Sequence, residues 1–169
     1  MDLASEGQCN IMIRECNKRP RIFFPPPVLF AFIFGAGYLL QKYYALKIIS
    51  GYSDIRINIS IVLFIAYWII TVPTVAQMIR NNTSFSGHGC TTILLKGGFF
   101  RFSRNPLYLS LLIVMASIAF YVNSLWFVFV IPVLLLSLDR LVVVQEERFL
   151  EEKFGDDYLL YKKNVRRWL

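Results

Sequence analysis

The chain has 169 residues, of which 56% are hydrophobic and 16% aromatic, and its net charge is +7. This composition excludes an ordinary soluble domain, which carries more charged and fewer apolar residues, and it indicates a small membrane protein. The basic residues flank apolar runs, which favours contact with a lipid bilayer over nucleic-acid binding.

Residues 1–22 are predicted to form a retained, poorly ordered amino-terminal tail on the cytoplasmic side. They include basic residues but no apolar run of signal-peptide length. Residues 23–169 are then predicted to form one membrane domain. The cysteines and the single histidine are scattered, which predicts free thiols and no metal site; they are Cys9, Cys16, Cys90 and His88.

Two apolar segments in the first half of the chain are predicted to cross the membrane. The first runs from about residue 28 to 46, after the prolines of 25–27, which stiffen its start. Its small residues 35–37 suit close helix packing, either within the chain or in a dimer. The second runs from about residue 55 to 79, and Pro73 inside it is expected to kink the helix.

The third and fourth apolar segments are predicted to form a helical hairpin. The third starts at Pro106 and ends near Val122, which is short for a full crossing. Residues 123–124 make a tight turn, and the fourth segment follows from about residue 125 to 144. No residue before Gly155 breaks a helix, so the fourth helix should continue beyond the membrane to that glycine.

A final short helix is predicted after Gly155, with Asp156 or Asp157 as its cap. Four aromatic and apolar residues recur at spacings of three and four and therefore share one face of this helix: Tyr158, Tyr161, Val165 and Trp168. Basic residues occupy its other faces. The pattern is typical of an interfacial helix that places aromatic rings at the depth of the lipid headgroups.

The predicted fold is therefore all-α. It is an integral membrane bundle of about four transmembrane helices, with a cytoplasmic extension of the last helix and a carboxy-terminal interfacial helix. Most of the basic residues lie in the tail, the middle loop and the carboxy-terminal segment, which four spans place on one side. The positive-inside rule makes that side cytoplasmic, so both termini are predicted to be cytoplasmic.

Two polar clusters interrupt this apolar chain. The first, residues 97–108, combines two glycines and two arginines with an asparagine and a proline. Glycines let the backbone approach a ligand, and arginines bind carboxylates or phosphates. The second cluster, residues 145–148, follows the fourth span and holds Glu146 and Glu147. Both clusters are predicted to meet at the cytoplasmic surface and to hold one cofactor.

The residues alone leave two interpretations of these clusters. The glutamates either pair with nearby basic side chains or bind the amine or ribose diol of a ligand. Arg101 and Arg104 are either topological anchors or donors to an anionic group. A cofactor with a carboxylate, an ammonium and a ribose would match both clusters, as S-adenosylmethionine does, although a dinucleotide would also suit the arginines.

Five features of the second half of the chain occur together: Arg104-Asn105-Pro106-Leu107-Tyr108, the helical hairpin, Glu146-Glu147, Phe154-Gly155-Asp156-Asp157-Tyr158 with Tyr161, and Val165-Arg166-Arg167-Trp168. As a set they resemble the isoprenylcysteine carboxyl methyltransferase and phospholipid methyltransferase superfamily. The first half of the chain matches this superfamily loosely, and its proline run resembles small bacterial members.

The resemblance implies an integral membrane methyltransferase that uses S-adenosylmethionine at the cytoplasmic face. Its acceptor is lipophilic and arrives from the bilayer. The implied cofactor-binding residues are Gly98, Arg101, Arg104, Asn105, Pro106, Tyr108, Glu146 and Glu147, of which Arg104, Tyr108 and Glu147 are the candidate catalytic residues. Asn105 replaces the histidine of the isoprenylcysteine enzymes, which weakens the case for their particular substrate. The acceptor therefore stays open between an isoprenylcysteine-like carboxylate, a phospholipid amine or other lipid, and a small thiol.

The expected reaction is direct in-line methyl transfer without a metal. An amine acceptor would also need a base, for which Glu147 or Tyr108 is the candidate. Two other functions compete with this one. An NADPH-dependent membrane reductase related to sterol reductases would need a longer chain. A non-catalytic four-helix membrane protein would have no need of the arginines and glutamates that this chain carries.

Overall fold

The computed structural model describes residues 25–48, 53–81 and 93–169, and these residues form helices and no strand. The predicted tail, the three cysteines and the histidine lie outside the described residues. The elements are α2 (Pro26–Tyr43), α3 (Ser53–Arg80), the 3₁₀ turn η1 (Gly98–Arg101), α4 (Pro106–Val122), α5 (Leu125–Leu138), the π-helical turn η2 (Asp139–Val143), α6 (Val144–Phe154) and α7 (Asp156–Asn164).

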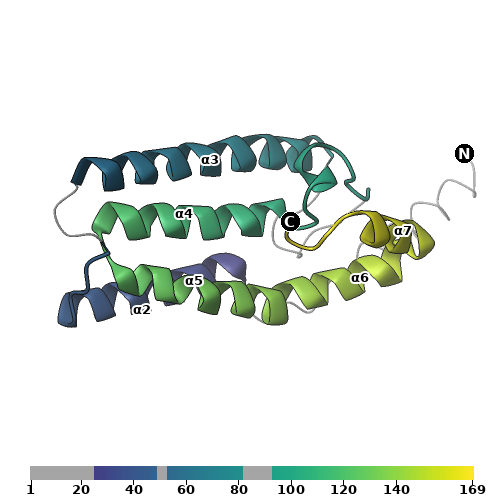
Figure 1. The fold of residues 1–169 in the computed structure, drawn as a ribbon. Coiled ribbons are helices and arrows are strands. Elements are labelled where there is room, and N and C mark those ends of the chain that lie inside the picture. Colours follow the sequence, from purple (N-terminus) through teal and green to yellow (C-terminus); the bar gives the residue numbers. More distant parts are fainter. Residues whose placement is uncertain (1–24, 49–52, 82–92) are drawn as a thin grey trace, which may run out of the picture.

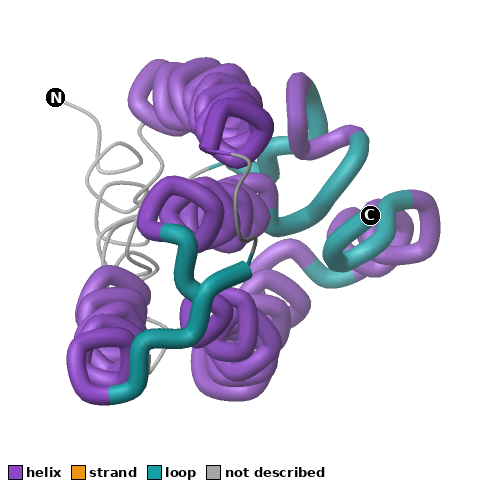
Figure 2. Tube along the Cα trace, turned by 60° about the vertical axis from the view of Figure 1, so that its left-hand side comes forward, coloured by secondary structure: helices purple, strands orange, loops and turns teal. Residues whose placement is uncertain are grey.

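The long helices run side by side along one direction (Figure 1). Helix α3 packs along α4, α4 packs against α5, and α5 packs along α2. The turned view in Figure 2 shows the same helices as neighbouring tubes that do not cross at steep angles. Apolar side chains between α2, α4 and α5 fill the core, and the fully buried ones include Met115, Ala119, Phe127, Leu134 and Leu138.

Local sequence signals place the ends of the hairpin helices where they were predicted. Pro106 occupies the first turn of α4, where its missing N–H costs no hydrogen bond. Asn123 ends α4 in the left-handed conformation, with φ 56°, and asparagine is one of the residues that tolerates it. Its side-chain Oδ1 also accepts a hydrogen bond from the backbone of Ile48 at 3.0 Å, which ties the hairpin to the link after α2.

The small residues of α2 serve packing within the chain at one position. A Cβ added at Gly37 would lie 3.3 Å from the ring of Phe127 and 3.5 Å from Val130, so glycine lets α2 approach α5 closely. A Cβ at Gly35 would meet nothing within 4 Å. The predicted role in helix packing is therefore confirmed for Gly37.

The fourth helix continues past the apolar segment, as predicted. The elements α5, η2 and α6 follow one another without a break from Leu125 to Phe154. Gly155, with φ 51°, ends this helix in a conformation that glycine adopts without strain. The π-helical turn in the middle was not predicted, and its consequence for the site is described below.

Two helices in the described part of the chain are long and apolar enough to cross a membrane, Asp54–Arg80 and Leu125–Phe154. The shorter apolar helix Pro106–Val122 lies between them. Large hydrophobic side chains on the outer face of α3 are exposed, as a surface in contact with lipid requires; among them are Ile61, Val62, Ile65 and Ile69. The number of four spans stays a prediction.

Helix α7 differs from the predicted interfacial helix in what its tyrosines contact. Tyr158 and Tyr161 share one face, but that face is buried against the protein. The hydroxyl of Tyr161 donates a hydrogen bond to the carbonyl oxygen of Phe100 at 2.7 Å. The exposed apolar residues of α7 are instead Leu159 and Leu160. Internal packing, rather than headgroup contact, therefore accounts for the two tyrosines.

The prediction that Val165 and Trp168 belong to this helix is wrong. Helix α7 ends at Asn164, and Val165 is extended, with φ −124° and ψ 131°. The residues after it turn back toward the start of α4, where their carbonyl groups accept hydrogen bonds from another segment. These long-range bonds replace the helical ones and outweigh the local helical periodicity.

Candidate active site

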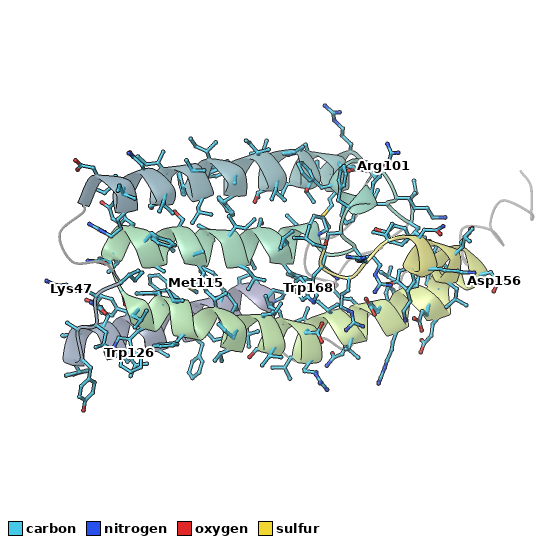
Figure 3. The ribbon with its side chains drawn as sticks, viewed as in Figure 1. Lys47, Arg101, Met115, Trp126, Asp156 and Trp168 are labelled. Carbon is cyan, nitrogen blue, oxygen red and sulfur yellow. The ribbon has the colours of Figure 1, made fainter. Side chains whose placement is uncertain are left out.

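Three segments of the chain meet at the end of the bundle where α4 begins. They are the loop 97–105, the start of α6, and residues 165–169, which we call the closing segment. In Figure 3 the closing segment, marked by Trp168, lies between α4 and the continuous α5–α6 helix. The two polar clusters found in the sequence therefore lie at the same end of the molecule.

The loop holds the closing segment by its backbone carbonyl groups. The backbone N–H of Arg104 donates to the carbonyl oxygen of Arg166 at 3.1 Å. The Ser103 hydroxyl and the Asn105 side-chain amide both donate to the carbonyl oxygen of Arg167, at 3.1 and 3.2 Å. Asn105, predicted to bind a cofactor, therefore fixes the position of another segment of the chain.

Glu147 lies at the centre of this arrangement and is only 5% exposed. Its Oε1 is 3.0 Å from Nη2 of Arg104. The guanidinium of Arg167 donates to both carboxylate oxygens, from Nε to Oε1 at 3.0 Å and from Nη2 to Oε2 at 2.7 Å. Lys162 lies 3.9 Å from Oε2. Burying a charged carboxylate is costly unless it is paired and hydrogen-bonded in this way.

Arg167 joins two carboxylates. Its Nη1 donates to the Asp139 carboxylate, at 3.1 Å from Oδ1 and 3.3 Å from Oδ2. The indole N–H of Trp168 donates to the same Oδ1 at 3.3 Å. The hydrogen bonds from Arg167 to Glu147 raise the pKa of the Arg167 guanidinium, and the charge of Asp139 adds to this effect. Arg167 therefore stays positively charged.

The π-helical turn selects which of the two glutamates is buried. In a regular α-helix, residues 142 and 146 would follow Leu138 on its buried face, at spacings of four. Val142 is fully buried, and the turn over Asp139–Val143 inserts one extra residue, so Val143 and then Glu147 are buried as well. Such insertions occur often at functional sites. Without it, Glu146 would take the place of Glu147.

Arg104 has donors to spare. Its side chain is 8% exposed, yet Nε and Nη1 are buried and have no hydrogen-bond partner among the described residues. The side-chain oxygen Oε1 of Gln145 is the other buried side-chain atom without a partner in the described part of the chain. Because a buried unpaired donor or acceptor is costly, these atoms mark a place for a polar ligand group.

Tyr108 and Glu146 form a second polar pair. The hydroxyl of Tyr108, on the first turn of α4, donates to Oε1 of Glu146 at 2.6 Å. Pro106 starts that turn and is buried. The structure thus brings together Arg104 with Glu147 and Tyr108 with Glu146, as the sequence predicts for a site shared by the two clusters.

Gly98 and Arg101 lie on the other side of the loop, against α3. Gly98 has φ +57°, and a Cβ there would come within 2.7 Å of Oε1 of Gln77. Arg101 is exposed (Figure 3). No contact among the described residues joins either of them to the glutamates. They line an open pocket of about 350 Å³ together with Pro73, Gln77, Phe99 and Phe102.

A comparison with known protein families identifies the family of this chain. The phospholipid methyltransferase family matches residues 55–157, more than half of the chain. The chain belongs to this family. The resemblance found in the sequence is thereby confirmed, and the chain is a membrane protein whose family implies methyl transfer to lipid-like substrates. The match ends before the closing segment begins.

One relative covers part of this phospholipid methyltransferase family member. An uncharacterized protein from Haemophilus influenzae is 42% identical over 64 residues, which are 37% of this chain and all of that protein. No solved structure matches the chain.

Sequence reasoning missed two residues of the site in this family member. Asp139 carried a signal, since an acidic residue inside an apolar helix is rare and is usually paired with a cation. Arg167 belongs to the segment Val165-Arg166-Arg167-Trp168 that contributed to the family resemblance, but it stands among other basic residues, and no signal in the sequence indicated a role for it in the site. In the described part of the chain no group of three potential metal ligands is found.

Proposed function

We propose that the protein transfers a methyl group from S-adenosylmethionine to a lipophilic acceptor at the cytoplasmic face of a membrane. The observation that carries this proposal is the buried side chain of Arg104, whose Nε and Nη1 lack partners within the described chain. Such donors suit a carboxylate. The family supports methyl transfer and a lipid-like substrate.

The unpartnered atoms of the site fit the functional groups of this cofactor. Either Nε or Nη1 of Arg104, which face opposite edges of the guanidinium, would donate to its carboxylate. The buried oxygen of Gln145 and the carboxylate of Glu146 would accept from its ammonium or ribose hydroxyl groups. Glu147 is already held by Arg104 and Arg167, so we assign it to positioning Arg104. The assignment of Gly98 and Arg101 to the cofactor stays a prediction.

The bound cofactor supplies an electrophilic methyl group on a sulfonium. The protein residues then orient this group toward the acceptor and keep water away from it. As the acceptor's bond to the methyl carbon forms, the carbon–sulfur bond of the sulfonium breaks and leaves a neutral thioether. An amine acceptor must also lose a proton. The carboxylate of Glu147 is held in ion pairs with arginines, and taking a proton would disrupt these pairs. The side chain of Glu146 is bonded only to the neutral hydroxyl of Tyr108 among the described residues. We therefore assign Glu146 to take that proton, and a carboxylate acceptor would need no base.

Calorimetry on the detergent-purified full chain tests this proposal. S-adenosylmethionine should bind, and NADPH should not. Arg104→Gln and Glu146→Gln should each weaken binding by about tenfold or more, since each removes a charged hydrogen-bond partner. Arg148→Gln and Glu152→Gln are matched controls, because both side chains lie exposed on the same α6. These controls should bind as the unaltered protein does.

The competing functions have their own outcomes in the same experiment. If a folded sample binds NADPH and not S-adenosylmethionine, the reductase is favoured and the methyltransferase is excluded. If it binds neither, the protein is a scaffold without this cofactor. If S-adenosylmethionine does bind, a radiolabelled methyl group recovered in the lipid fraction of a membrane extract would define the acceptor.

A further inference from the structure

We infer that Arg167 is a positioning residue that keeps Arg104 available for an anionic ligand group, by binding both oxygens of Glu147. This inference rests on the proposed function, in which Arg104 binds the cofactor carboxylate. It gives the closing segment a role in the site, although that segment lies outside the region matched by the family.

The first step concerns how the two arginines share one carboxylate. Arg167 uses Nε and Nη2 to reach both oxygens of Glu147, the paired geometry in which arginine binds a carboxylate most strongly. Arg104 makes a single contact, from Nη2 to Oε1 at 3.0 Å. Its Nε and Nη1 are buried and are left without a partner in the part of the chain that the structure describes.

The second step concerns what Glu147 would do without Arg167. Its two oxygens would then be open to Arg104, which already contacts Oε1 and is buried, whereas the side chain of Lys162 near Oε2 is 38% exposed. A paired contact from Arg104 would use Nε as well as Nη2. One of the two donors proposed for the ligand would be lost, and the charge of Arg104 would be satisfied within the protein. An anionic ligand group would then bind more weakly.

The third step is that Arg167 is held in place independently of Glu147. Its carbonyl oxygen accepts hydrogen bonds from Ser103 and Asn105. Its Nη1 is bonded to Asp139, and the neighbouring Trp168 packs against the apolar core and donates to the same carboxylate. The arginine is therefore fixed on both sides of its contact with Glu147.

The test compares binding of S-adenosylmethionine to four forms of the full chain in detergent. Arg167→Gln should weaken binding by about tenfold, because a charged partner of Glu147 is lost. Adding Glu147→Gln to that variant should restore most of the affinity. The neutral amide oxygen can accept one hydrogen bond from Arg104, but it does not neutralise the charge of Arg104 as a carboxylate would. Arg166→Gln is the matched control, because it removes the same charge from an exposed neighbour in the closing segment.

Recovery in the double variant also shows that the weaker binding of Arg167→Gln is not simple misfolding. The inference is overturned if Arg167→Gln binds as the unaltered protein does, if the double variant binds no better than Arg167→Gln alone, or if Arg166→Gln loses as much affinity.

A second measurement needs no ligand, so it decides the inference even if the proposed function fails. Thermal unfolding of Arg104→Gln, Glu147→Gln and their combination gives the coupling between these two side chains. The same cycle is then repeated in the Arg167→Gln background. The coupling should increase there, because Glu147 turns to Arg104. An equal or smaller coupling would overturn the inference. Absence of S-adenosylmethionine binding to the unaltered protein, by contrast, would count against the proposed function alone.

Discussion

At the scale of single residues, the site separates side chains that hold structure from side chains that are ready for a ligand. The Asn105 amide donates to the carbonyl oxygen of Arg167, and the Glu147 carboxylate is paired with two arginines. Within residues 25–48, 53–81 and 93–169, Arg104 has donors without a partner, and Gln145 has an oxygen without one. Residue type alone could not separate them, because both groups consist of the polar residues expected in a binding site.

The hydrogen bond between Tyr108 and Glu146 gives a prediction at this scale. Tyr108→Phe keeps the buried ring but removes the hydroxyl that donates to Glu146 at 2.6 Å. We expect the free energy of unfolding to fall by about 2 kcal/mol, the contribution typical of a hydrogen bond to a charged group. Thermal unfolding in detergent, followed by tryptophan fluorescence, measures this change.

Glu146→Gln serves as the control for that prediction. Its amide oxygen can still accept from the Tyr108 hydroxyl, so it should cost less stability than Tyr108→Phe. Equal unfolding midpoints for Tyr108→Phe and the unaltered protein would show that this hydrogen bond contributes nothing to stability.

At the scale of elements, α4 and the α5–α6 helix show what the sequence could predict. Pro106, the turn at 123–124 and Gly155 are local signals, and each helix end lies where its signal stands. The π-helical turn has no such signal, because one extra residue changes the register without changing the apolar character of the segment. The position of Glu147 in the core was therefore not predictable from the sequence.

Helix α7 shows the other limit of local patterns. The spacing of Tyr158 and Tyr161 correctly placed them on one face, but not what that face contacts. The same spacing extended the helix to Trp168, although the chain leaves the helix after Asn164. The partners of the closing segment, Ser103 to Asn105, lie 62 to 64 residues earlier in the chain. A helical repeat cannot predict contacts over that separation.

The register argument gives a prediction at the scale of elements. Deleting Leu141, an exposed residue in the π-helical turn, should convert that turn to a regular α-helix. Val143 and Glu147 would then follow Leu138 at spacings of four and keep their buried face. We expect a folded protein that still binds S-adenosylmethionine, as measured by thermal unfolding and calorimetry.

Deleting Arg148 is the matched control. This residue is also exposed and lies in the same continuous helix, but no extra residue after it can absorb the deletion. Everything beyond it should rotate by about 100°, which moves Tyr161 away from Phe100. Equal stability of the two deletion variants would contradict the argument from register.

At the scale of the whole molecule, different segments of the chain form the two ends of the bundle. One end holds the link after α2 and the turn between α4 and α5, whereas the other holds the loop 97–105, α6 and α7 (Figure 1). Lys47 and Asp156 mark these opposite ends in Figure 3. The positive-inside rule predicts that the site end faces the cytoplasm.

Single cysteines test that orientation. In a variant without the native cysteines, Lys47→Cys and Asp156→Cys place thiols at exposed positions on opposite ends. In intact cells, an impermeant maleimide should label Lys47→Cys and leave Asp156→Cys unlabelled until the membrane is permeabilised. The reverse result would place the site outside the cytoplasm, away from the compartment that the proposed cofactor requires.

The loop 97–105 is synthesised well before the residues that bond to it, because these lie much later in the chain. Phe100 receives its hydrogen bond from Tyr161, 61 residues later, and the α4–α5 hairpin is made in between. A nascent chain interrupted between residues 154 and 161 would hold the complete hairpin, yet its loop would lack these partners. Synthesis of the hairpin therefore precedes synthesis of the residues that complete the site.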